Sequence, residues 1–160
     1  FTIMPHSQRV LIFLSCTEMY RNGEGVVRDP KKAAEWYRKA AEQGYAEAQN
    51  NLGLLYAGGT GVVKDEAKAA EWYRKAAEQG NAAAQNNLGL LYVDGRGVAK
   101  DEAKAVEWYR KAAKQGHEAA QYNLSLIEWQ LLNRAAEQKN VDFQDGLTGT
   151  APTANPVRQK

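Results

Sequence analysis

Apolar residues follow a helical pattern in the segment 30–42. They fall at i, i+3, i+4, i+7 and i+8 and so form one stripe along a helix: Ala33, Trp36, Tyr37, Ala40 and Ala41. Asp29 stands at the N-cap position before this run, and Gly44 supplies the left-handed residue that commonly ends a helix. The pattern predicts an amphipathic helix that begins after Asp29 and ends before Gly44.

A second helical pattern follows in "AEAQNNLGLLY" at 46–56. Ala48, Leu52 and Tyr56 fall four residues apart on one face, and Gly53 allows a neighbouring helix to approach closely. A G-x-G-V stretch leads from this helix to the next aspartate, and its glycines suit positive φ angles. The chain is therefore predicted to alternate first and second helices that are joined by glycine loops.

This helical pair recurs with a period of 36 residues. The stretch 53–80 agrees with 89–116 at 22 of 28 positions, and 23–44 agrees with 59–80 at 18 of 22 positions. A period of this length with helical spacing inside it predicts a stacked helical array. A tryptophan–tyrosine pair marks each copy, and we expect the three tryptophans to be core residues: Trp36, Trp72 and Trp108.

The amino-terminal segment departs from the repeat. Counting back 36 residues from Leu52 reaches Cys16, which predicts a divergent first helix with this cysteine in a core position. The alternative is a short leader, "RVLIFLSC", that ends in a lipidatable cysteine. Because the chain starts at Phe1 and not at Met, we expect a fragment or a processed product.

The carboxyl-terminal segment departs in another way. "AAQYNLSLIEW" keeps Leu124 in register, but Ser125 replaces the close-packing glycine and no G-x-G-V loop follows. Instead "LLNRAAEQKN" resembles "WYRKAAEQGN" brought 13 residues closer. We expect one longer helix over 117–139 that caps the array, and a disordered tail after it. The expected boundaries are an N-terminal segment 1–8, repeats at 9–44, 45–80 and 81–116 within an array 9–139, and a tail 140–160.

Composition and charge exclude several classes of function. With 21 basic and 19 acidic residues the net charge is +2, so the chain shows no electrostatic footprint for nucleic acid. No apolar run approaches the ~18 residues of a membrane span. One cysteine, and two histidines without ligand spacing at His6 and His117, provide no metal site. We expect a monomer without cofactor or metal and without enzymatic activity.

The repeated pattern A-x-x-x-L-G-x-x-Y-x-x-G-x-G-V-x-x-D-x-x-K-A-x-x-W-Y-x-K-A-A-x-x-G resembles the Sel1-like repeat, a relative of the tetratricopeptide repeat. It runs from Ala48 to Gly80 and from Ala84 to Gly116, and its second half runs from Gly23 to Gly44. The resemblance implies an all-α solenoid, a right-handed superhelix of about three and a half repeats with a C-terminal capping helix.

The same resemblance implies a function. Sel1-like proteins are usually bacterial adaptors for protein complexes, so we expect a protein or peptide partner. The compartment stays open: cytoplasmic, or periplasmic or secreted if an upstream leader has been lost. Some cysteine-rich relatives have been linked to β-lactam binding or hydrolysis, which gives an enzymatic alternative; this chain lacks their repeat cysteines and has no S-x-x-K motif. A purely structural spacer, or an assembly subunit that stacks end to end, is the third alternative.

Asparagines in the first helices are the candidate binding residues. Asparagine is disfavoured within helices because its amide competes with the backbone, yet each complete first helix has two. A side-chain amide offers a donor and an acceptor and so can bind a peptide backbone, whereas a bond to the neighbouring repeat is the structural alternative. With their apolar neighbours, the residues expected on the concave face are Asn50, Asn51, Leu54, Asn86, Asn87, Leu90, Tyr122 and Asn123.

Overall fold

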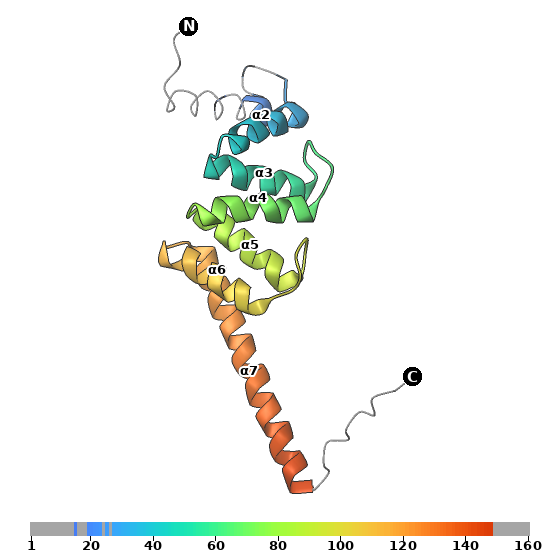
Figure 1. Ribbon diagram of the computed structural model, residues 1–160, viewed down its shortest axis with the longest axis vertical. Coiled ribbons are helices and arrows are strands. Elements are labelled where there is room, and N and C mark those ends of the chain that lie inside the picture. Colours follow the sequence, from blue (N-terminus) through green and yellow to red (C-terminus); the bar gives the residue numbers. More distant parts are fainter. Residues whose placement is uncertain (1–14, 16–18, 24, 26, 149–160) are drawn as a thin grey trace, which may run out of the picture. The chain divides into compact units, whose positions relative to one another are not determined.

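The computed structural model describes residue 15, residues 19–23, residue 25 and residues 27–148. Within these residues the regular secondary structure is helical, and α2 to α6 pack consecutively against one another (Figure 1). The predicted core position of Cys16 lies outside the described residues, as does the segment 1–8. The helices are α2 (Pro30–Glu42), α3 (Ala46–Gly58), α4 (Glu66–Glu78), α5 (Ala82–Asp94), α6 (Glu102–Lys114) and α7 (Glu118–Thr148).

The predicted caps define the ends of these helices. Asp29 Oδ1 accepts hydrogen bonds from the backbone N–H groups of Lys31 and Lys32 at 3.0 and 3.1 Å. Asp65 and Asp101 each accept one from the N–H three residues later, at 3.0 Å. The glycines that follow the second helices all have positive φ angles, between 81° and 92°. The predicted stop and start signals are therefore confirmed.

The chain divides after Leu124 into two compact units. Helices α2 to α6 belong to the first unit, and α7 begins in the first unit and ends in the second. In the first unit the all-α solenoid is confirmed: first helices α3 and α5 alternate with second helices α2, α4 and α6.

Glycine and tyrosine pack together where the two helices of a repeat meet. A Cβ at Gly53 would lie 2.6 Å from Cδ1 of Tyr73, and a Cβ at Gly89 would lie 2.6 Å from Cε1 of Tyr109. Each tyrosine ring therefore occupies the space that a side chain on the first helix would need. This close approach is what the glycines of the first helices predicted. The core beside it consists of leucine and alanine, with Leu52 fully buried.

The expectation that the tryptophans are core residues is wrong in part. Tyr37, Tyr73 and Tyr109 are buried, whereas the adjacent tryptophans are only half-buried. The outer face of each tryptophan ring is covered by a lysine of the same helix, with the Nζ of Lys75 4.1 Å from the ring centre of Trp72. The tyrosine is the residue after the tryptophan, so its side chain points further round the helix axis and faces the first helix of the repeat.

Glutamines join successive repeats in a relay of hydrogen bonds. Gln49 Nε2 donates to the carbonyl oxygen of Ala41 at 3.1 Å, and Gln79 Nε2 donates to Gln49 Oε1 at 2.7 Å. The first bond adds a second partner to a carbonyl in the last turn of the preceding second helix, which also accepts from the N–H of Gly44 at 3.0 Å. The same relay recurs one period later, through Gln85 and Gln115. The sequence pattern did not predict this relay.

The expected boundary at 139 is wrong, because α7 runs on to Thr148. Lys139 occupies the position where Gly44, Gly80 and Gly116 end the second helices of the complete repeats. Without a residue that readily adopts a positive φ, nothing at this position stops the helix. Residues 149–160 of the expected tail lie outside the described residues.

Candidate protein-interaction surface

The first helices place the candidate binding residues at different depths. Asn50 and Asn86 are buried, whereas Asn51 and Asn87 one residue later are half-buried. Leu54 is 48% exposed. Leu90, one period after Leu54, is half-buried. In α7, Asn123 in the outer position is half-buried, and Tyr122, which replaces the inner asparagine, is exposed. The expected residues therefore form an inner column of amides and an outer column that solvent reaches.

Hydrogen bonds connect the two columns from repeat to repeat. Asn87 Nδ2 donates to Asn50 Oδ1 at 3.1 Å, and Asn123 Nδ2 donates to Asn86 Oδ1 at 2.9 Å. These bonds correspond to the structural alternative for the asparagines. The pairing starts at Asn50, since the residue one period earlier is Leu14, which has no amide to offer Asn51.

The outer amides keep hydrogen-bonding capacity beyond these bonds. A primary amide has two N–H donors and an oxygen with two lone pairs, and the bond to Asn50 uses one donor of Asn87. That bond fixes the position of the Asn87 side chain on its half-exposed helix face. Leu54, close to Asn51 on α3, adds an exposed apolar side chain to the same helix. The combination provides polar and apolar contacts without a charge.

Titratable groups of the array serve caps and core. The N–H of Lys68 donates to Asp65 and holds the pKa of that carboxyl below its ordinary value, and Lys104 has the same effect on the pKa of Asp101. Burial raises the pKa of the Tyr73 hydroxyl to about 12. Among the residues that the structure describes, no three His, Cys, Asp or Glu side chains gather where they could hold a metal ion. Asp65 and Asp101 thus serve as helix caps, and Tyr73 belongs to the core.

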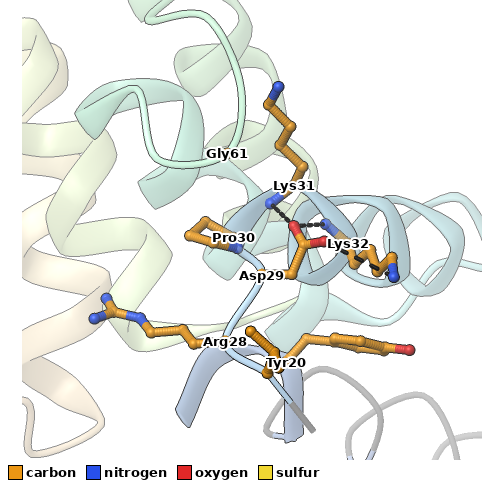
Figure 2. Close-up of a pocket in the computed structure, with 8 residues that line it drawn as sticks. Tyr20, Arg28, Asp29, Pro30, Lys31, Lys32 and Gly61 are labelled. Carbon is orange, nitrogen blue, oxygen red and sulfur yellow. Dashed lines mark hydrogen bonds and ion pairs between the residues drawn. The ribbon is translucent and has the colours of Figure 1, made fainter. Parts of the chain in front are cut away.

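A cavity of ≈ 690 Å³ opens beside the first turn of α2 (Figure 2). The Asp29 carboxylate in it accepts the two backbone N–H bonds of the cap and lies 3.9 Å from the Nζ of Lys32. That lysine also lies over the ring of Tyr20, 5.4 Å from its centre. This carboxylate is engaged as the cap of the helix. Its lining consists of Tyr20, Val27, Arg28, Asp29, Pro30, Lys31, Lys32 and Gly61.

Together the alternating helices, the 36-residue period and the bonds between repeats define an α-solenoid of the tetratricopeptide-like class. The family model described as "Sel1 repeat" matches residues 10–45, 46–81 and 82–117. The chain belongs to the Sel1 repeat family, as the sequence pattern indicated. Proteins of this family are generally interaction modules and typically non-enzymatic scaffolds, so a protein is the class of partner that the fold suggests.

Solved structures support this assignment. A Sel1 repeat protein from Oxalobacter formigenes is 42% identical, with a TM-score of 0.72 over 78% of this chain and 52% of that one. The protective antigen c5321 of uropathogenic Escherichia coli is 44% identical, with a TM-score of 0.65 over 69% of this chain and 23% of that one. Helicobacter pylori cysteine rich protein B is 26% identical, with a TM-score of 0.59 over 71% and 90%. No curated protein matches the chain.

The chain spans about half the length of the Oxalobacter protein and about a quarter of c5321. The described part of the chain contains no helix that combines the length and the apolar character needed to cross a membrane.

Proposed function

We propose that this protein is a non-enzymatic adaptor that binds an extended peptide segment of a partner protein along its first helices. The observation that carries the proposal is the outer column of half-exposed amides, two of which, Asn87 and Asn123, are held in place by the inner column. Family membership supports a protein partner, and the amide chemistry supports a peptide as the bound element.

The outer amides suit a peptide backbone because it presents N–H and C=O groups in alternation. Asn51, Asn87 and Asn123 would each offer a donor and an acceptor to it, one per repeat. Leu54 would contact an apolar side chain of the peptide. Because the bond to Asn50 already restricts Asn87, binding would cost less side-chain entropy than it would for a free asparagine. The contacts include no charged group, so binding would depend little on salt.

Selection of peptides from a displayed random library, followed by calorimetry, tests this proposal. The variant combines Asn51→Ala with Leu54→Ala, because no hydrogen bond of either side chain joins α3 to a neighbouring repeat in the described structure. A matched control is Val63→Ala, which truncates an 87% exposed side chain in the loop after α3. We expect the double variant to weaken the selected peptides at least about 10-fold while its melting temperature stays unchanged. Equal affinity for the double variant and the control would contradict the proposal.

A further inference from the structure

The helix α7 exposes large apolar side chains along its length. Water-exposed apolar residues that continue over several turns mark an interaction surface. One apolar set recurs every seven residues, at 122, 129, 136 and 143, which is the spacing of a helix that packs against another helix, and Leu132 lies three residues after Trp129 on the same side. The most exposed apolar residues of α7 are Tyr122, Trp129, Leu132, Phe143 and Leu147.

The second half of α7 has the sequence of a second repeat helix. "LLNRAAEQKN" at 131–140 is identical to "WYRKAAEQGN" at 72–81 in 5 of 10 positions. In the complete repeats such a helix folds back on the first helix after a glycine loop, as α4 does on α3. Here the connecting residues are missing and α7 is one helix from Glu118 to Thr148. Its second half therefore cannot fold back onto its own first half.

The residues at the missing helix–helix contact have changed together. In complete repeats the contact pairs glycine with tyrosine, as in Gly53 with Tyr73. The corresponding residues of α7 are Ser125 and Leu132. The glycine position has therefore gained a side chain, and the tyrosine position has lost its aromatic ring. The combined side-chain volume of the two positions stays nearly the same, because the larger residue at the glycine position accompanies a smaller one at the tyrosine position. The two residues are seven apart on one helix, about 10 Å along its axis, and cannot form that contact within one copy.

We propose that two copies of this chain form a symmetric dimer in which their α7 helices pack antiparallel. The second half of each α7 then takes the place of the missing second helix in the other copy. Exchange of an equivalent element between copies is a known route to dimers when a hinge loop is shortened. The dimer replaces the monomer that the sequence favoured, and it does not depend on peptide binding.

The Gly53–Tyr73 pairing fixes the register of this dimer. Ser125 lies opposite Leu132 of the second copy, which places the two-fold axis between positions 128 and 129. Trp129 then lies beside Trp129 of the second copy at the centre of the interface. The same register brings Glu118 opposite Lys139 of the second copy, so opposite charges meet at both ends. A second copy fits this surface because each residue pair of the register occurs twice, once in each direction, in a two-fold dimer.

Sedimentation velocity of the full chain over low to high micromolar concentrations tests the proposal. We expect a dimer that dissociates on dilution. Leu132→Asp would bury a carboxylate twice, once in each copy, and we expect it to raise the dissociation constant at least about 100-fold. The matched control is Leu147→Asp, on the same helix and equally exposed, but beyond the residues that the register pairs. The control should leave the dimer intact, and circular dichroism should show the same melting of both variants at a concentration where each is monomeric.

Cysteine pairing tests the register independently. In a Cys16→Ser background, Ser125→Cys with Leu132→Cys should give a covalent dimer on mild oxidation, whereas Ser125→Cys with Arg134→Cys should not. A chain that stays monomeric at every concentration would overturn the proposal and assign the apolar face to a different protein. A dimer that survives Leu132→Asp, or one that Leu147→Asp disrupts, would overturn it as well.

Discussion

Replacing Gly53 by alanine tests whether the tyrosine ring, and not helix propensity, requires glycine in the first helices. An alanine Cβ would lie 2.6 Å from both Cδ1 and Cε1 of Tyr73 and 3.2 Å from Cγ. Carbon atoms in contact are ordinarily ~3.5–4.0 Å apart, so the shortfall is about 1 Å. Tyr73 is 3% exposed, and its ring cannot move into solvent to relieve the clash.

The net effect follows from two opposing terms. In an unobstructed helix, alanine is more favourable than glycine by about 1 kcal/mol. Overpacking a filled core costs about 1–3 kcal/mol, and a 1 Å shortfall against an immobile ring belongs at the upper end of that range. We therefore expect Gly53→Ala to lower the free energy of unfolding by about 2 kcal/mol.

Urea unfolding followed by circular dichroism measures this difference. Gly58→Ala is the matched control in the same helix, because its nearest neighbour would be Thr60 Oγ1 at an ordinary 3.5 Å. We expect the control to be neutral or slightly stabilising. Adding Tyr73→Leu, the residue that α7 has at the corresponding position, to Gly53→Ala should recover part of the loss. The reasoning is refuted if Gly53→Ala is as stable as Gly58→Ala, or if the two substitutions are strictly additive.

Two further predictions concern the array. Burial raises the pKa of Tyr73 and Tyr109 from 10.0 to about 12, so the folded state binds their protons more tightly than the unfolded state. This contribution to stability is complete below pH 10 and is lost as the pH rises to about 12, and thermal melts across that range should show a decline that Tyr73→Phe with Tyr109→Phe reduces. Asn86→Ala removes the acceptor of the bond from Asn123 and should cost about 1–2 kcal/mol in urea unfolding. Asn51→Ala removes no bond between asparagines of neighbouring repeats and should leave the free energy of unfolding unchanged.

Local signals in the sequence predicted the helices because each signal acts within a few residues. An aspartate cap such as Asp65 needs only the N–H groups of the next turn, and Gly80 needs only its own backbone angles. The 36-residue period then predicted that the helical pairs stack on one another. The end of α7 at Thr148 was not predicted, because the aligned segment keeps the repeat's pattern while Lys139 replaces the glycine that would stop the helix there.

Contacts between repeats could not be predicted in the same way. Trp72 and Tyr73 satisfy the same helical stripe, and only the position of the neighbouring helix decides which of them is buried. The asparagine pairing likewise joins residues 37 apart, one more than the period. Periodicity alone placed the asparagines in columns of equal position, so the bond between adjacent columns depends on the rotation from one repeat to the next.

The glutamine relay has a consequence for how such a chain can change in length. Two successive junctions use the same three groups: the carbonyl of Ala41 or its equivalent, a first-helix glutamine and a second-helix glutamine. Suppose that one whole unit is duplicated or deleted, with the junction at Gly44 or Gly80. The repeats that become neighbours then meet through the same glutamine donor and the same carbonyl acceptor as before. Recombination can therefore lengthen or shorten the array in steps of 36 residues without any compensating mutation.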